Sequence, residues 1–316
     1  MVDYLNRYGY APDRDAIGRA LDIIAANLDN VASEQVYKEC FSMMDLTTLK
    51  TDDTPASVTK LVGKVNKFQE TYPEWPLPAS VCVYSNFASV VKAARAADFN
   101  ITVVSACFPT SQSFLEVKLK EVEMAVEQGA DEVDIVLALN AFLAGDYEAA
   151  SKEIREVRRV IDEVAGRQGR EVHLKVILET GLLRSPENIA NASFLAMEAG
   201  ADFIKTSTGK VDVNATPVAA YVMCECIAKF HAMTGTFEKF VYFFFVDCFL
   251  FKQQFYHFVH NAVIGGEDFN SAFVVVVDYR LYVVVDFAVH FFAVIGVSAP
   301  TFSNENFLIA TKIQTT

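Results

Sequence analysis

Two stretches of the chain repeat one pattern, EQGADEVDIV at residues 127–136 and EAGADFIKT at residues 198–206. In both, a helical segment ends near a glycine, an aspartate follows in a turn, and an apolar run of β-strand character begins. Further apolar runs with β-branched residues lie at 81–87, 101–108 and 173–180. Strands of this kind, separated by helical segments, predict a parallel sheet that helices cover on both sides.

Two fold classes fit this alternation, and the polar residues decide between them. A doubly wound sheet would carry a glycine-rich nucleotide loop after its first strand, and none is present there. A TIM barrel places polar residues at the carboxyl ends of its strands, and polar clusters follow several of the apolar runs here. The sequence therefore predicts an α/β fold of the TIM (β/α)8 barrel type. The expected helical stretches are 15–39, 54–71, 87–97, 113–128, 148–165, 186–199 and 216–231, with the helix starts Thr54-Pro55 and Ser185-Pro186.

The composition changes near residue 234, and this change sets the predicted domain organisation. Residues 234–316 hold 16 of the 26 phenylalanines but only four Lys or Arg residues. Charged residues such as Asp278 and Arg280 interrupt the longest apolar run, which disfavours a membrane span. The last two β/α units are expected to be atypical or not formed. We predict an N-terminal helical extension at 1–40, barrel strands 1–6 with their helices at 41–233, and an atypical Phe- and Val-rich segment at 234–316.

The overall charge and the cysteines indicate the class of partner and the compartment. A formal net charge of −13 argues against nucleic acid or an anionic membrane as the main partner. The six cysteines are scattered, without a C-x-x-C motif or metal-ligand spacing, and the N-terminus lacks the pattern of a signal peptide. We therefore expect reduced thiols, a cytoplasmic location, no metal, and small molecules as partners, with a homo-oligomer as an open alternative to a monomer.

Lys205, within FIKTSTGK at residues 203–210, is the first candidate for chemistry. It is expected to share the inward face of its strand with Phe203. One interpretation is a lysine whose stem packs on neighbours while its ammonium reaches water. The other is a Schiff-base nucleophile, because burial lowers a lysine pKa from about 10.4 and favours the neutral amine.

Asp134 and Lys175 are the next candidates. Asp134 lies within its strand on the same face as Glu132, and it is either a carboxylate paired with a cation or a general acid/base. Lys175 belongs to a strand that should neighbour that of Asp134. A Lys–Asp–Lys arrangement in one barrel is expected to lower the pKa of a lysine and to hold the acid in place. The STGK loop at 207–210 could bind a phosphate.

Five motifs together resemble the 2-deoxyribose-5-phosphate aldolase family: MDLTTL, ACFPTSQ, ADEVDIVLALNAFLAGDYE, LKVILETGLL and FIKTSTGK. The resemblance runs from about Cys40 to Met233. It implies a TIM-barrel lyase without cofactor, which reversibly cleaves 2-deoxy-D-ribose 5-phosphate to acetaldehyde and D-glyceraldehyde 3-phosphate in deoxynucleoside catabolism. It also implies that Lys205 forms the Schiff base and that Asp134 donates and accepts the proton. The implied substrate-site residues are Asp45, Thr47, Cys82, Lys175, Thr208 and Lys210.

The chain departs from the family after residue 233. The family's seventh strand has the form G-F-K-P-A-G-G, with a second lysine and glycines that hold the phosphate, whereas this chain has TGTFEKFVYFFFVDCF at 234–249. Lys239 is not given the role of the second lysine, because no Pro-Ala-Gly-Gly follows it. Two alternatives stay open: an inactive or misfolded family member with a frameshifted C-terminus, and a Schiff-base barrel enzyme with a different aldehyde donor.

Overall fold

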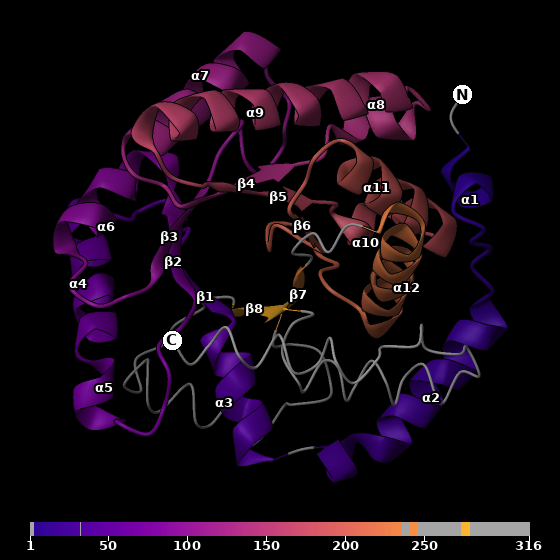
Figure 1. Cartoon of the computed structure of the whole chain (residues 1–316), viewed down its shortest axis with the longest axis horizontal. Helices are drawn as coiled ribbons and strands as arrows, with labels where there is room; N and C mark the ends of the chain where they lie inside the picture. The colour runs from indigo at the N-terminus through magenta and orange to yellow at the C-terminus, as the bar shows by residue number, and fades with distance from the viewer. Residues whose placement is uncertain (1–2, 32, 236–240, 246–272, 279–316) are drawn as a thin grey trace.

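Six parallel strands form the greater part of the sheet. The computed structural model describes residues 3–31, 33–235, 241–245 and 273–278. In Figure 1 the strands curve around a common centre and the helices lie outside them. Successive strands β1 to β6 pair in parallel, each with the next along the chain, which confirms the predicted strand–helix alternation. The six are β1 (Met44–Thr47), β2 (Ser80–Tyr84), β3 (Asn100–Val104), β4 (Glu132–Val136), β5 (His173–Ile177) and β6 (Phe203–Lys205).

Two further strands depart from the regular barrel pattern. β8 (Phe273–Asp278) pairs antiparallel with β1, and β7 (Val241–Phe245) pairs antiparallel with β8. The strand order β6-β5-β4-β3-β2-β1-β8-β7 places β6 and β7 at its two ends. All strands of a regular (β/α)8 barrel are parallel, so the expectation of atypical last units is confirmed for these two strands. Lys239 and the rest of 234–316, apart from residues 234–235 and these two strands, lie outside the described residues.

The helices begin where the sequence predicts them. The Thr54 side chain accepts a hydrogen bond from the Ser57 backbone N–H at the start of α4, and a proline occupies the first turn. Ser185 plays the same role for α11. The helices after β1 are α4 (Pro55–Asn66), α5 (Phe68–Thr71), α6 (Ala88–Ala94), α7 (Leu115–Glu127), α8 (Leu139–Leu143), α9 (Tyr147–Gln168), α10 (Thr180–Leu183), α11 (Pro186–Glu198) and α12 (Pro217–Thr234), and the short 3-10 helix η1 (Ser85–Phe87) precedes α6.

The N-terminal segment packs on the outside of the barrel. It forms α1 (Tyr4–Arg7), α2 (Arg14–Val31) and α3 (Glu34–Ser42), so the single helical stretch predicted at 15–39 is two helices. Ser33 separates them, since its side chain caps the start of α3. The Tyr8 ring stacks on Phe194 of α11 with centroids 4.3 Å apart, and Arg7 pairs with Glu198 at 2.6 Å. Across the described residues, the helices lack the combination of length and hydropathy that a membrane span requires.

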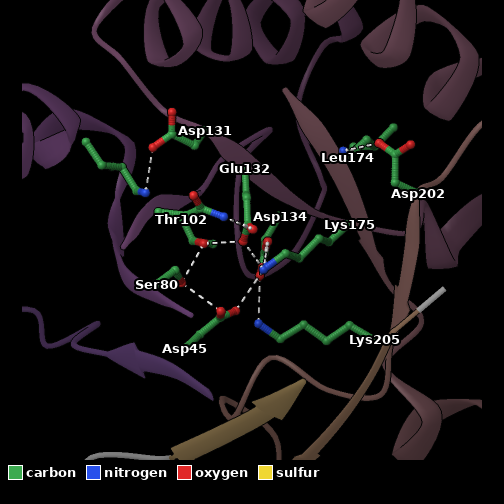
Figure 2. Close-up of polar contacts among 12 residues, drawn as sticks. Asp45, Ser80, Thr102, Asp131, Glu132, Asp134, Leu174, Lys175, Asp202 and Lys205 are labelled. Atoms are coloured by element: carbon green, nitrogen blue, oxygen red, sulfur yellow. Dashed lines mark hydrogen bonds and ion pairs between the residues drawn. The ribbon is translucent and has the colours of Figure 1, made fainter. Parts of the chain in front are cut away.

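The repeated Gly-Ala-Asp pattern fastens neighbouring strands together. Asp131 accepts a hydrogen bond from the backbone N–H of Ile101 at 2.9 Å, which ties the start of β4 to β3. Asp202 accepts one from the backbone N–H of Leu174 at 2.7 Å, which ties the start of β6 to β5. Figure 2 shows the second of these bonds beside the interior of the barrel. In both copies of the repeated pattern, the aspartate therefore fixes the position of one strand relative to its neighbour.

Gly181 lets the turn after β5 approach the loop after β6. A Cβ atom at Gly181 would lie 2.0 Å from the backbone oxygen of Val213, so one of the two segments would have to move. We expect G181A to lower the free energy of unfolding by about 1–3 kcal/mol, as overpacking does. The matched control is G63A in α4, where nothing lies within 4 Å of the added atom. G63A should be neutral or stabilising by about 0.5–1 kcal/mol, and equal urea midpoints for both variants would contradict the prediction.

Candidate active site

The interior of the barrel brings together charged residues from three neighbouring strands. Asp134 of β4 stands opposite Lys175 of β5 in the strand register, as expected from the sequence. Lys205 is the last residue of β6, and its Nζ atom lies 2.7 Å from Oδ2 of Asp134. All three side chains are buried. Buried charges of this kind persist only where opposite charges and hydrogen bonds compensate them, and here each lysine has a carboxylate beside it.

Lys175 lies among three carboxyl groups. Its Nζ atom is 2.9 Å from Oδ2 of Asp45 and 3.9 Å from Oδ1 of Asp134, and it forms an ion pair with Oε2 of Glu132. Figure 2 shows these side chains pointing toward one another from β1, β4 and β5. Lys175 therefore links the pair Lys205–Asp134 to a second group of acids deeper in the barrel.

The electrostatics of the two lysines differ from the expectation. Burial lowers the pKa of Lys205, but Asp134, the Cys82 thiol and Asp45 raise it, and the result lies above the ordinary value. Burial likewise lowers the pKa of Lys175, yet its carboxylate neighbours raise it well above the ordinary value. The predicted lowering of a lysine pKa was wrong, because three carboxyl groups surround two ammonium groups. Because only a neutral amine is nucleophilic, a reaction at Lys205 would first require transfer of its proton to a neighbour.

A row of hydroxyl groups joins two of the acids. Oγ of Ser80 lies 2.6 Å from Oδ1 of Asp45 and 2.8 Å from Oγ1 of Thr102. Thr102 Oγ1 in turn lies 2.6 Å from Oε2 of Glu132. Sequence reasoning did not single out Ser80 or Thr102. The available signal was their position, since each occupies an alternate place on an apolar strand that faces the interior.

The loop after β6 is held by groups from other strand ends. Glu179 follows β5 in a left-handed conformation with a φ of 54°. Its carboxylate accepts hydrogen bonds from Oγ1 of Thr208 at 2.5 Å and from the Thr208 backbone N–H at 3.3 Å. Lys210 donates to the backbone oxygen of Leu49 at 2.6 Å. Backbone strain of this kind often occurs at functional sites. Glu179 was not among the predicted site residues, although it holds the loop that carries Thr208.

The structure groups most, though not all, of the predicted substrate-site residues. Thr47 donates to the backbone oxygen of Asp45 at 3.1 Å, and it pairs in register with Cys82 of β2. Cys82 is buried, and burial raises the pKa of its thiol. Asp45, Cys82 and Lys175 thus lie close to the Lys205–Asp134 pair, and Thr47 is next to Cys82 in the sheet. Lys210 is exposed. The functional roles of these residues stay predictions.

The fold and the site together define a class of protein. A buried lysine in contact with a carboxylate, at the carboxyl end of a barrel strand, is typical of α/β-barrel enzymes whose lysine reacts with carbonyl compounds. Residues 40–263 match the family described as DeoC/LacD family aldolase. The chain therefore belongs to this family. The match continues beyond Met233, where the resemblance by motifs ends.

Proteins similar to this chain in sequence or structure are named as aldolases. Deoxyribose-phosphate aldolase of Homo sapiens is 41% identical over 205 residues, which are 61% of this chain and 62% of that protein. The match thus spans less than two thirds of the human relative. Deoxyribose-phosphate aldolase of Agrobacterium fabrum is 38% identical over 187 residues, 59% of this chain and 67% of that protein. The solved structure named QR15, an aldolase, is 28% identical with a TM-score of 0.52, covering 60% of this chain and 76% of its own.

Asp45 should make stability depend on pH. Burial raises its pKa from 3.8 to about 6, so the folded protein prefers the protonated acid and loses stability as pH rises from the ordinary pKa through about 6. A shift of about two units corresponds to about 3 kcal/mol. D45N cannot ionise and lacks this loss. We expect the free energy of unfolding of D45N, relative to that of the unsubstituted protein, to rise by about 3 kcal/mol between about pH 4 and pH 7.

The comparison of D45N with the unsubstituted protein isolates the contribution of Asp45. Glu132 acts in the opposite direction, because Lys175 and hydrogen bonds from Thr102 and Asn100 outweigh its burial and lower its pKa. Since Glu132 is present in both proteins, its contribution cancels to first order in the difference. Urea unfolding at a series of pH values measures that difference, and a difference independent of pH would contradict the raised pKa of Asp45.

Proposed function

We propose that this chain is a deoxyribose-phosphate aldolase, which reversibly cleaves 2-deoxy-D-ribose 5-phosphate to acetaldehyde and D-glyceraldehyde 3-phosphate. The observation that carries the proposal is the buried contact of 2.7 Å between Lys205 Nζ and Asp134 Oδ2. Membership of the DeoC/LacD family and the names of the relatives support the choice of substrate. The residue roles that the resemblance implies for Lys205 and Asp134 are part of this proposal.

The first half of the proposed reaction forms the Schiff base. Lys205 passes a proton to Asp134 across their hydrogen bond, which leaves a neutral amine. The amine nitrogen adds to the aldehyde carbon C1 of the open-chain sugar and gives one of its protons to the carbonyl oxygen. Asp134 then returns to this oxygen the proton that it took from Lys205, and is a carboxylate again. Water then leaves, and a protonated Schiff base joins Lys205 to C1. The positive nitrogen becomes the electron acceptor for the next step.

The second half breaks the carbon–carbon bond. A base removes the proton of the C3 hydroxyl, the C2–C3 bond breaks, and its electron pair moves through C2 and C1 to the nitrogen. C3 becomes the aldehyde carbon of glyceraldehyde 3-phosphate, and C1 and C2 remain on Lys205 as an enamine. Protonation of C2 and addition of water release acetaldehyde and restore the amine. We assign to Asp134 the role of accepting and returning these protons, which its contact of 2.7 Å with Lys205 Nζ supports.

The remaining predicted site residues are proposed to bind the substrate. Thr208 and Lys210 belong to the loop that directly follows Lys205, where hydroxyl, backbone N–H and ammonium groups suit a phosphate or a hydroxylated chain. Asp45, Thr47, Cys82 and Lys175 would line the wall of the site. Small phosphorylated sugars and aldehydes as partners and a cytoplasmic location are further parts of the proposal, and the family and the composition support them. A homo-oligomer stays an open alternative to a monomer.

Borohydride trapping tests the proposed nucleophile. The full chain is mixed with 2-deoxyribose 5-phosphate or acetaldehyde and reduced, and the added mass is located by peptide mapping. We expect the adduct on Lys205, because Asp134 can take its proton. Lys175 and Lys118 are internal controls, since both are buried lysines held by carboxylates.

Three other outcomes would change the assignment. An adduct on Lys175 instead of Lys205 would overturn the assignment of the nucleophile. Folded protein without any adduct would favour the alternative of a family member that lacks the chemistry. An adduct with acetaldehyde but not with the sugar phosphate would point to a different substrate for the same lysine.

A second variant tests the proton transfer. D134N keeps the size of the side chain but cannot accept the proton from Lys205, and loss of a general acid/base costs about 10²–10⁴-fold in rate. We expect a drop of about that size in the turnover of 2-deoxyribose 5-phosphate. D162N on the outer surface of α9 is the matched control and should leave turnover unchanged. Equal turnover in D134N and D162N would exclude Asp134 as the acid/base.

A further inference from the structure

We propose that Asp45, Ser80, Thr102 and Glu132 form a buried hydrogen-bonded chain that holds one exchangeable proton, carried on Asp45. The presence or absence of this proton sets the negative charge beside Lys175 and Lys205, and through that charge it affects the pKa of Lys205. The presence of the proton on these four residues is independent of the proposed function. The effect of the proton on the reactivity of Lys205 rests on that function.

The first argument is a count of hydrogens. The hydrogen-bonded row consists of four oxygen atoms, one each from Asp45, Ser80, Thr102 and Glu132. The three successive O···O distances are 2.6, 2.8 and 2.6 Å. All three distances are those of hydrogen bonds, and each bond needs its own hydrogen. The two hydroxyl groups supply one hydrogen each. The third hydrogen must therefore belong to one of the two terminal carboxyl groups.

The surroundings assign that hydrogen to Asp45. Glu132 also accepts a hydrogen bond from Nδ2 of Asn100 at 3.0 Å and forms an ion pair with Lys175, and both contacts favour its ionised form. At Asp45, burial outweighs the attraction of Lys175 and raises the pKa. Asp45 then donates to Ser80, Ser80 to Thr102 and Thr102 to Glu132. The other oxygen of Asp45 remains free to accept from Lys175 at 2.9 Å.

The second argument is the balance of charge. Among the described residues of the cluster, three carboxyl groups face two ammonium groups. One proton on Asp45 makes this cluster neutral, whereas its loss leaves an uncompensated buried negative charge, which is costly. The titratable groups that face Asp45 from the described strands are Lys175 of β5, Glu132 and Asp134 of β4, Lys205 of β6 and the thiol of Cys82 of β2.

The proton has a consequence for the reactive lysine. When Asp45 ionises, its negative charge further raises the pKa of Lys205. The fraction of neutral Lys205 amine then increases less with pH than it would beside an acid that cannot ionise. Ser80, Thr102 and Glu132 are positioning residues in this scheme, because they act through Asp45 and not on the substrate.

Infrared spectroscopy of the full chain over a pH series observes the proton directly. The C=O stretch of a protonated carboxyl group gives an infrared band that is separate from the bands of a carboxylate. We expect the difference between the unsubstituted protein and D45N to show this band in mildly acidic solution and to lose it as pH rises toward neutral. Absence of the band in folded protein, or an equal band in D45N, would overturn the proposal.

A second variant, T102V, tests the hydrogen-bonded row of Asp45, Ser80, Thr102 and Glu132. This test does not depend on how D45N folds. T102V removes one hydroxyl, so the remaining Ser80–Asp45 contact needs no hydrogen from a carboxyl group. We expect the pH midpoint of the band to fall by about one unit, the equivalent of about one hydrogen bond. The control is T180V, which removes a buried hydroxyl that has no hydrogen-bond partner among the described residues. Equal midpoints in T102V and T180V would overturn the role of the chain.

The pH profile of Lys205 trapping by acetaldehyde and borohydride connects the proton to reactivity. In D45N the trapping rate should rise more steeply with pH than in the unsubstituted protein. Identical profiles would show that Asp45 does not act on Lys205. The infrared measurement requires no turnover, so failure of the proposed function would leave that result intact and remain distinguishable from failure of the proton chain.

Discussion

The compensation of two buried ammonium groups by three carboxyl groups is the constraint on which the barrel interior depends. Lys175 contacts carboxyl groups from β1 and β4, and Lys205, at the end of β6, contacts Asp134 of β4. Removing one partner from such a buried pair costs about 3–5 kcal/mol, because it leaves a charge without compensation. The same contacts that hold the strands in place therefore also set the protonation of the groups available for chemistry.

This arrangement favours a resting site over a reactive one. The carboxylates keep both lysines protonated, whereas Schiff-base formation needs a neutral amine. The short contact with Asp134 lets Lys205 lose its proton across one hydrogen bond. In the proposed scheme, the hydrogen-bonded row from Asp45 to Glu132 sets how much negative charge lies beside the lysines. Stability and reactivity are thus adjusted through the same few acids.

Much of the fold and the identity of the central residues could be predicted from the sequence. Period-two alternation placed Asp134 and Lys205 on inward faces, and the helix starts at Thr54 and Ser185 were correct. The direction of the lysine pKa shifts was wrong, because it depends on how many acids converge. Asp45 is 130 residues from Lys175 in the chain, and no local pattern shows that they meet. Serine and threonine are too common on strands for Ser80 and Thr102 to stand out.

Local periodicity and short motifs are enough to predict the strand–helix alternation, the family resemblance and the residue types capable of carbonyl chemistry. The folded arrangement is needed to see which acids surround each lysine, how many hydrogens the row from Asp45 to Glu132 needs, and that β8 pairs antiparallel with β1. Charge interactions and hydrogen bonds depend on distances of a few ångströms between residues far apart in the chain, and burial strengthens them by excluding water.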